Sequence, residues 1–244
     1  LFMGFWLGPL LLAFDLYPGN TEEGTVAVDL IARGLRVLDS LGISPDQILL
    51  LADSAYGQGH ILTALKASKL NYILGMNRHR KYLAKKSKEF RPKYWKTTST
   101  PCRNHRSEEF CCFVYQAEEW DSNVDILAAR YLVHGELVHQ TSFLTSNLTL
   151  DQVRKLPDDC KGDSLNSSVW RTYARKQQCE NHQKDLLSDL GMHHPSSART
   201  CVNQVLYQIA AIALTIGVFI SRALLPEPFH NARLWRIART LYNI

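Results

Sequence analysis

The stretch LLLADSAYGQGH at residues 49–60 places an apolar run directly before a carboxylate and a series of small residues. A short, continuous apolar run bounded by turn residues is typical of a strand buried in a parallel sheet. Asp53 ends this run, and two interpretations of it are open. It can cap the helix that follows, or it can bind a metal ion at the carboxyl edge of a sheet, where α/β folds commonly carry their active sites.

Strands and helices are predicted to alternate around this stretch. An apolar strand leads into the turn at 18–20, and a capping box at 20–23 starts a helix whose apolar residues keep helical spacing up to Gly42. Residues 61–70 continue as a second helix, and NYILGM at 71–76 as a second buried strand. This order predicts an α/β sheet whose parallel strands are connected by helices.

Charge is concentrated in one part of the chain. The 244 residues are 45% hydrophobic, enough for one or two domains with a real core, and the net charge is +5. Residues 78–106 hold eleven Lys and Arg against the single Glu89. Such a patch fits DNA, because phosphates attract cations and bases can stack on Tyr94 or Trp95. The alternative is a solvated loop, and no lipidation motif beside it points to a membrane.

The second half of the chain is predicted to change from strands to helices. Residues 108–149 are rich in β-forming residues, with a hairpin turn at 134–136, and we interpret them as a β-rich insertion. A polar loop near 157–168 follows. Helical spacing then runs from Val169 to Leu190 and ends at Gly191, an expected C-terminal cap.

One long apolar segment is close in length and composition to a membrane-spanning helix. Val205 to Ser221 carries no charge, but its 17 residues only reach the bottom of the spanning range, and they include Gln208 and Thr215. We therefore expect residues 202–223 to form a buried helix, with a membrane-associated protein as the alternative. A basic amphipathic segment ends the chain.

The six cysteines are scattered without paired spacing, which indicates a reduced, cytosolic compartment. One zinc arrangement is conceivable, Cys102-x-x-His105 followed by Cys111. No second ligand pair at finger spacing accompanies it, so the sequence does not favour structural zinc.

The helical stretch WRTYARKQQCENHQKDLLSDL at 170–190 resembles the last catalytic helix of bacterial insertion-sequence transposases of the DDE class. Their signature is Tyr-x2-Arg-x3-Glu-x6-Lys, and Tyr173 and Glu180 stand at the right spacing. The signature arginine falls at Lys176, with Arg175 displaced by one position. The final lysine falls at Leu187.

Other blocks support this resemblance in the same order along the chain. Lys184 agrees with the common Glu-Asn-x-x-Lys form of the signature, and LYPGNT at 16–21 resembles the turn before the family's first long helix. LLADSAYGQGHIL at 50–62 resembles the strand that carries the second aspartate. The long β-rich segment before the glutamate helix is similar to the insertion of this group.

The resemblance implies a ribonuclease H-like α/β fold, a mixed sheet with flanking helices interrupted by a β-rich insertion. Residues 1–77 and 158–244 would form this core, and residues 78–157 the insertion. Two Asp and one Glu would hold two Mg²⁺ or Mn²⁺ ions, with Asp53 as the second acid and Glu180 as the third. Asp15 stands in the wrong place for the first acid, which we expect before residue 1, so this chain alone is expected to be inactive.

The implied activity is metal-dependent DNA cleavage and strand transfer in transposition, a form of DNA recombination. The partners would be transposon ends, target DNA and a second copy of the chain in a synaptic complex, in the cytoplasm at the nucleoid. The DNA-binding candidates are Tyr173, Arg175, Lys176, Lys184, Arg78, Arg80, Lys81, Lys85 and Lys86.

Two alternatives remain for these residues. The chain can be a catalytically inactive, DNA-binding transposase remnant, which the departures at Lys176 and Leu187 favour. Glu180 can also be an ordinary exposed glutamate paired with Lys176 and Lys184, and Tyr173 a core tyrosine.

Overall fold

The structure is a computed structural model that describes residues 2–18, 20–76, 80–102, 104–118, 120–194, 196–230 and 232–242. The chain divides into two compact units, which we describe separately. The sheet unit comprises Glu23–Val28 and Leu38–Lys176. The terminal unit comprises Leu1–Glu22, Asp29–Val37 and Gln177–Ile244.

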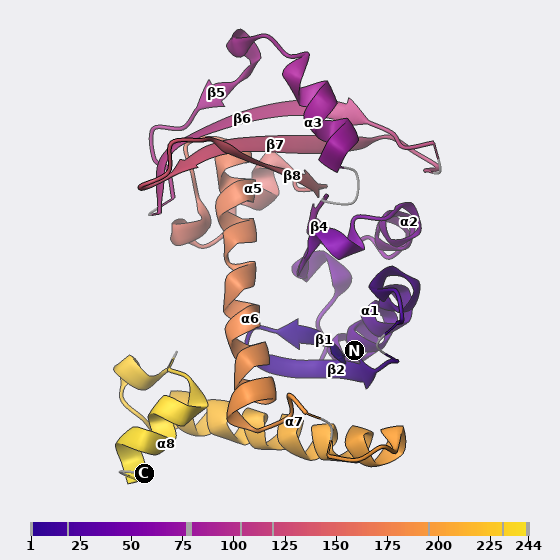
Figure 1. Cartoon of the computed structure of the whole chain (residues 1–244), viewed down its shortest axis with the longest axis vertical. Helices are drawn as coiled ribbons and strands as arrows, with labels where there is room; N and C mark the ends of the chain where they lie inside the picture. Colours follow the sequence, from indigo (N-terminus) through magenta and orange to yellow (C-terminus); the bar gives the residue numbers. More distant parts are fainter. Residues whose placement is uncertain are drawn as a thin grey trace. The chain divides into compact units, whose positions relative to one another are not determined.

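The sheet unit is built on one mixed sheet of six strands in the order β3-β4-β8-β7-β6-β5 (Figure 1). The strands are β3 (Leu49–Ala52), β4 (Asn71–Gly75), β5 (Lys96–Thr97), β6 (His105–Tyr115), β7 (Val124–Val133) and β8 (Gln140–Ser146). β3 and β4 are parallel and are connected through helix α2 (Gly59–Ala67), as the sequence predicted, and all the other pairs are antiparallel.

The β-rich segment continues the sheet that β3 and β4 begin. β8 pairs with β4, with Ile73 opposite Ser146, and β7 and β6 follow outward in the sheet. The three segments expected from the sequence, 1–77, 78–157 and 158–244, stay a prediction, but 78–157 shares its sheet with the strands of the first segment. The pairing also changes the expectation for β3, which lies at the sheet edge and is half-buried instead of buried on both faces.

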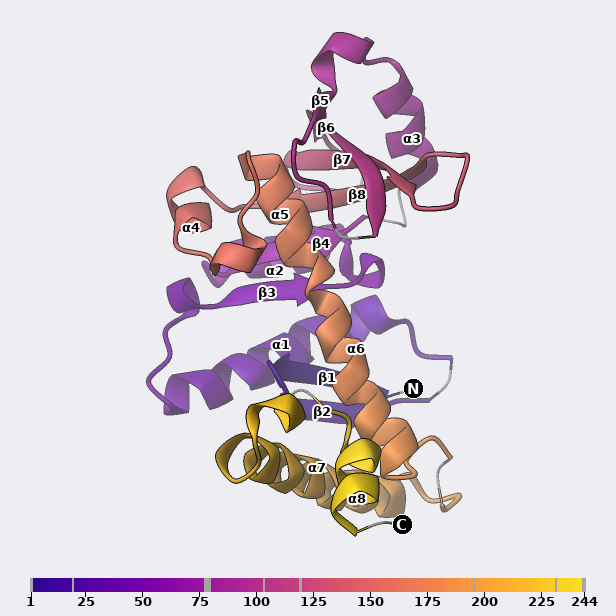
Figure 2. The same ribbon diagram turned by 90° about the vertical axis from the view of Figure 1, so that its left-hand side faces the viewer.

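Helices cover both faces of this sheet. α4 (Leu150–Arg154) and α5 (Leu165–Ala174) lie on one face, where Val169 and Trp170 pack against Phe110. α3 (Arg80–Lys88) lies on the other face, as the two perpendicular views show (Figures 1 and 2). The sequence assigned no structure to the basic segment, which was expected to bind DNA, and part of this segment forms helix α3.

The terminal unit contains a hairpin of β1 (Phe2–Leu7) and β2 (Leu10–Leu16), and helix α7 (Thr200–Ala223) contacts β2. Tyr207 of α7 stacks on Phe2 with ring centroids 5.4 Å apart, in a cluster that includes Leu186. Helix α1 (Glu23–Ser40) contributes residues to both units. It ends as predicted, just before Gly42.

The helical stretch expected at 169–190 is present but interrupted. α5 ends at Ala174, α6 spans Lys176–Lys184, and a π-helical turn occupies Asp185–Asp189 before Gly191. The break falls at Arg175, whose backbone N–H closes the last turn of α5 on the carbonyls of Thr172 and Tyr173. The predicted terminal glycine is confirmed, because Gly191 has a φ of 72°.

Helix α7 corrects the expectation of a buried helix. Its buried residues are Asn203, Tyr207, Ala210, Leu214 and Ser221, and only 22% of its most apolar window is buried. One face packs on the hairpin and the other is exposed, because the described part of the terminal unit covers a single side. By length and composition, α7 could cross a membrane. One such helix is weak evidence for a membrane span, because core helices of soluble proteins can have the same length and composition.

The last helix, α8 (Leu234–Tyr242), is fixed to the π-helical turn by charged side chains. Arg233 Nε lies 3.1 Å from Asp185 Oδ1, and the guanidinium also pairs with Asp189. Short 3₁₀ turns complete the structure at Pro45–Gln47, Ser54–Tyr56, Pro92–Tyr94, Asp158–Cys160 and Glu227–Phe229.

Candidate active site and DNA-binding surface

Asp53 follows β3 directly and takes a capping role, at a 3₁₀ turn that precedes helix α2 and not at α2 itself. It is the N-cap of the 3₁₀ turn at Ser54–Tyr56, and its Oδ1 accepts hydrogen bonds from the backbone N–H and the hydroxyl of Ser54. Its side chain is nevertheless 57% exposed. The carboxylate therefore caps a turn and remains accessible to a cation.

Lys176 lies beside this carboxylate, with its Nζ 3.4 Å from Asp53 Oδ2, and only 19% of the lysine side chain is exposed. Partial burial alone would raise the pKa of Asp53. The hydrogen bonds from Ser54 and the positive charge of Lys176 outweigh this effect, so the net pKa of Asp53 is lowered. Asp53 is thus held in its ionised form.

Tyr173 reaches the same corner of the sheet unit. A Cβ atom placed on Gly75, the last residue of β4, would lie 2.7 Å from Tyr173 Oη and 2.8 Å from the backbone nitrogen of Ser54. The tyrosine ring packs against the hydrophobic core of the sheet unit. The ring of Tyr173 therefore belongs to the core, while its hydroxyl lies next to the turn that Asp53 caps. The hydroxyl can come this close because residue 75 is a glycine and has no side chain.

A second glycine explains part of the motif that follows Asp53. A Cβ on Gly57 would lie 2.5 Å from the carbonyl oxygen of Gly75 and 2.8 Å from Met76 Sδ. The turn after β3 therefore lies directly on the end of β4. The small residues of AYGQG allow this close packing, which places Asp53 at the end of the parallel pair.

The other residues of the signature helix lie further along it. Glu180 is exposed on α6 in the terminal unit, and Lys184 is exposed one turn later. Arg175 is bound in the sheet unit, where its Nη2 lies 3.2 Å from Asp159 Oδ2 and its Nη1 lies 3.2 Å from Cys160 Sγ. Lys176, and not Arg175, is the basic residue that lies next to Asp53.

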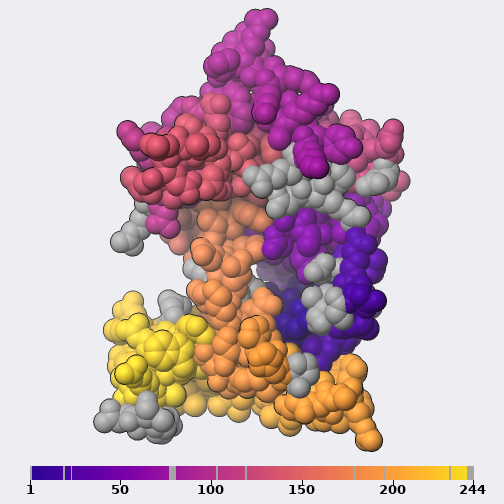
Figure 3. All heavy atoms as spheres, in the orientation of Figure 1, coloured from indigo at the N-terminus to yellow at the C-terminus, as the bar shows by residue number. Residues whose placement is uncertain are grey.

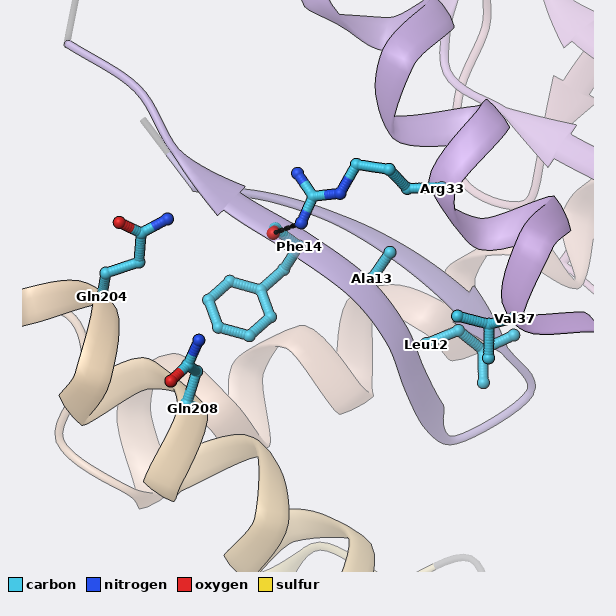
Figure 4. Close-up of a pocket in the computed structure, with 7 residues that line it drawn as sticks. All are labelled: Leu12, Ala13, Phe14, Arg33, Val37, Gln204 and Gln208. Atoms are coloured by element: carbon cyan, nitrogen blue, oxygen red, sulfur yellow. Dashed lines mark hydrogen bonds between the residues drawn. The ribbon is translucent and has the colours of Figure 1, made fainter. Parts of the chain in front are cut away.

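The carboxylate of Asp15 makes an ion pair and hydrogen bonds that hold the terminal unit together. Its Oδ2 lies 2.8 Å from Arg33 Nη1, and its Oδ1 accepts hydrogen bonds from Leu16 N and Gln204 Nε2. Two of these partners, Arg33 and Gln204, line a pocket of about 240 Å³ in the terminal unit (Figure 4). Its other lining residues are Leu12, Ala13, Phe14, Val37 and Gln208. Because Arg33 also donates to the carbonyl of Phe14, the pocket's charged group already has partners.

Helix α3 presents lysines to solvent. Leu83 and Ser87 are buried, so the opposite side of the helix faces outward. Lys81 and Lys85 are exposed there, and Lys86 is half-buried. Two other predicted DNA contacts cannot be placed: Arg78 lies outside the described residues, and Arg80 begins α3 with its side chain outside the description.

Aromatic side chains accompany these lysines. Tyr82 is 69% exposed and Tyr94 53% exposed, whereas Trp95 is half-buried. A cation lies near each of the last two rings, Lys93 Nζ at 5.2 Å from the ring centre of Tyr94 and the Arg130 guanidinium at 4.7 Å from that of Trp95. Tyr94, and not Trp95, is therefore the more open stacking surface of the two. Figure 3 shows the purple segment that carries them projecting from the sheet unit.

Sequence reasoning did not single out three further exposed lysines, Lys88, Lys93 and Lys96. The basic run itself was the signal for these lysines, but the sequence does not show which positions within the run are exposed. We define the basic surface as Lys81, Lys85, Lys88, Lys93 and Lys96 together with Tyr82 and Tyr94.

A family model described as transposase DDE domain, group 1, matches residues 3–244. No curated protein matches the chain. The match covers almost the entire chain, and the motif residues Asp53, Tyr173 and Lys176 lie at one corner of a mixed sheet. The chain belongs to the DDE transposase family.

Proposed function

We propose that the chain cleaves DNA strands and joins them to a target during transposition of an insertion sequence, as part of a ribonuclease H-like catalytic domain. Membership of the DDE transposase family implies nuclease and transposase activity on DNA and, in general, the use of divalent metal ions. The observation that best supports the proposal is the contact between Asp53 and Lys176, because it joins the strand motif to the signature helix.

In this proposal Asp53 and Glu180 are the second and third acids of the metal site, and Mg²⁺ or Mn²⁺ is the cofactor. Carboxylate oxygens are the ligands that these hard cations prefer, and Asp53 is accessible and ionised. Asp53 does not belong to any three-membered group of His, Cys, Asp or Glu ligands within the described ranges. The site therefore requires further carboxylates.

When bound, two metal ions would activate the attacking water or 3′-hydroxyl and neutralise charge on the attacking and leaving oxygens. Asp53 holds its negative charge for them, since its turn hydrogen bonds and Lys176 favour the ionised form. The ammonium of Lys176 adds a positive charge where DNA phosphates would approach.

We propose the basic surface as the main contact with DNA. Its lysines project from the outer side of α3 and the following segment, where phosphates can reach them. Tyr82 and Tyr94 offer exposed rings on which unpaired bases can stack. Arg78, Arg80, Lys86 and Lys184 remain candidates for further phosphate contacts, and Tyr173, Arg175 and Lys176 for contacts near the cleavage site.

The proposal includes a homodimer through the exposed face of α7. Exposed apolar side chains recur along it at alternating intervals of three and four residues, the spacing of a coiled-coil seam. These residues are Val202, Val205, Ile209, Ile212, Ile216 and Phe219. A second copy of the chain presents the same uncharged stripe, so two α7 helices can pack without repulsion. Dimer formation would explain why this apolar stripe is exposed without placing α7 in a membrane. A dimer of this kind fits a cytoplasmic protein bound to the nucleoid.

Cleavage of labelled transposon-end DNA by the complete transposase tests the proposed function. Nicking in Mg²⁺ or Mn²⁺ that stops in excess chelator is expected, while DNA binding continues without metal. Salt-sensitive binding with no nicking in any metal would identify an inactive remnant. Sedimentation with membranes after a high-salt wash would instead support the membrane-associated alternative.

A further inference from the structure

Three potential metal ligands meet on the α5 side of the sheet unit. Cys102 precedes β6, His105 begins it and Glu108 lies within it. One donor atom from each side chain, a sulfur, a ring nitrogen and a carboxylate oxygen, lies within 4.8 Å of the other two. No other group of three such ligands occurs in the described part of the chain.

Glu108 is buried to an extent that is unusual for a carboxylate, with 1% of the residue exposed. Its Oε1 contacts His105 Nδ1 and accepts hydrogen bonds of 3.1 Å from both Cys102 N and Trp170 Nε1. Its Oε2 is also buried and has no hydrogen-bond partner in the described structure. Since a buried, unsatisfied carboxylate oxygen is costly, this atom is where a cation would bind with the greatest gain.

The position of Glu108 also shows why the sequence pattern alone pointed to a different ligand. Cys111 was the third residue of the conceivable zinc arrangement, but it lies three residues after Glu108 on the same strand. Successive side chains of a strand point to opposite faces, so Cys111 faces away from this cluster. Glu108 takes the position that Cys111 could not reach.

The donor set is suited to zinc and unsuited to the catalytic ions. Thiolate sulfur and imidazole nitrogen bind Zn²⁺ well, whereas Mg²⁺ prefers oxygen ligands alone. Zinc–ligand bonds of about 2.0 to 2.3 Å place tetrahedral donors roughly 3.2 to 3.8 Å apart, so small side-chain rotations would complete the geometry. One thiolate and one carboxylate would balance the charge of the ion.

The surroundings of the Cys102 thiol favour its protonated form. Burial, and after it the neighbouring Glu108 carboxylate, raise the pKa of Cys102 to about 12, whereas the positive charge of Arg171 acts in the opposite direction. The Arg171 guanidinium is fixed in place by hydrogen bonds to the carbonyl oxygens of Lys161, at 2.7 Å, and Thr100. Because a metal ion deprotonates the thiol that coordinates it, zinc binding here must release a proton.

We propose that Cys102, His105 and Glu108 bind a structural zinc ion, with water in the fourth tetrahedral position. On binding, the Cys102 thiol releases its proton to solvent as the sulfur–zinc bond forms. The ion would link Cys102, which precedes β6, to His105 and Glu108 on that strand. Through Glu108 and Trp170 it also fixes α5, the helix that carries Tyr173 towards Asp53.

Cobalt substitution tests this site without relying on catalysis. The purified chain should bind one equivalent of Co²⁺ with a thiolate-to-cobalt charge-transfer band, and Zn²⁺ should displace it while Mg²⁺ should not. Cys102→Ser should abolish the band. Cys112→Ser is the matched control, because Cys112 lies on β6, is exposed, and should leave the band unchanged.

The same band in Cys102→Ser as in the wild type would overturn the proposal, and so would a wild-type chain that binds no Co²⁺. If Cys102→Ser does not fold, X-ray absorption of the cobalt-loaded wild type decides instead. One sulfur together with nitrogen and oxygen neighbours is expected, and a shell without sulfur would contradict the site.

Discussion

Asp53 uses its two carboxylate oxygens differently. Oδ1 accepts the hydrogen bonds that cap the turn at Ser54, and Oδ2 faces the ammonium of Lys176. This division favours the ionised carboxylate and holds it in one orientation. We propose that this arrangement helps Asp53 to coordinate a metal ion, because a carboxylate that is already held in place loses little freedom on binding.

Replacing Lys176 tests this electrostatic coupling. In Lys176→Gln the pKa of Asp53 should rise, because the positive charge that favours the carboxylate is removed while the burial that opposes it remains. The pKa of Asp53 can be followed by NMR titration of its carboxyl carbon. Lys155→Gln, an exposed change at the end of α4, should leave that pKa unchanged; an equal pKa in all three proteins would exclude the coupling.

Asp163 makes a second residue-level prediction. Slight burial raises its pKa, but hydrogen bonds from Ser99 and Ser167 outweigh this and lower the pKa to about 2 from the ordinary 3.8. A lowered native pKa stabilises the fold above the unfolded pKa, and this stabilisation is lost as the pH falls through the native value.

Asp163→Asn should therefore lower the melting temperature at pH 7, and the difference from wild type should shrink as the pH falls from about 4 towards 2. Thermal unfolding followed by circular dichroism at several pH values measures it. The exposed Asp151→Asn provides the control. A difference independent of pH would show that the charge of Asp163 is not responsible.

At the scale of single residues, the sequence could predict positions but not contacts. The strand end at Asp53 follows from the apolar run alone. The partner Lys176 could not be inferred, since the two residues are far apart in the chain and meet only through the packing of α5 on the sheet. Glu108 was missed because an alternating Glu on a strand is usually exposed, and only the covering Trp170 shows that it is buried.

At the scale of elements, α3 separates a structural side from a basic side. Leu83 and Ser87 are buried, and Lys81, Lys85 and Lys88 are exposed. This division makes the three lysines replaceable without loss of the core, so their contribution to DNA binding can be measured in a folded protein.

The triple change of Lys81, Lys85 and Lys88 to Gln should weaken DNA binding and flatten its dependence on salt. Removing one lysine–phosphate interaction should reduce the slope of log K against log salt by about 0.9. Fluorescence anisotropy at several salt concentrations measures this slope. Lys155→Gln at the end of α4 should keep the wild-type slope, and an unchanged slope in the triple variant would mean that α3 does not contact DNA.

The stripe on α7 gives a prediction about assembly. Ile212→Asp places a charge in the middle of the stripe and should convert a dimer into monomers, because burying the new carboxylate between two helices is costly. Light scattering coupled to size-exclusion chromatography measures the mass. Leu137→Asp, an exposed apolar residue in the turn between β7 and β8, is the matched control.

A wild-type chain that stays monomeric over a range of concentrations would refute a dimer through α7, as would an unaltered dimer in Ile212→Asp. Loss of the dimer in the Leu137→Asp control would place the interface elsewhere.

Helices and strands could be predicted where the local sequence pattern determines their type and their ends. The helices that became α1 and α2 follow from capping residues and apolar spacing, and β3 and β4 from short apolar runs. α3 was not assigned because its lysines outnumber its buried residues, Leu83 and Ser87. The exposure of α7 was not foreseen, since apolar composition does not reveal how many sides of a helix are covered.

At the scale of the whole molecule, the main unpredicted feature is the pairing of β8 with β4. This pairing joins segments far apart in the sequence and makes the β-rich segment part of one six-stranded sheet. Such long-range registers depend on which edges remain open after the local elements form, so a single sequence does not specify them. The family resemblance, in contrast, extends over nearly the whole chain, and the match of the family model to residues 3–244 confirms that the chain is a DDE transposase domain.

We propose that Asp53 and Glu180 are metal-binding acids of a DNA-cleaving enzyme. The most direct test is the rate of transposon-end nicking by the complete transposase in Mg²⁺ for Asp53→Asn and Glu180→Gln, with the exposed Asp151→Asn as control. Loss of a metal ligand should remove several kcal/mol of transition-state stabilisation, roughly a thousandfold in rate, while DNA binding and the control stay at wild-type levels. Nicking at the wild-type rate in either variant would show that the replaced acid does not hold a catalytic metal ion.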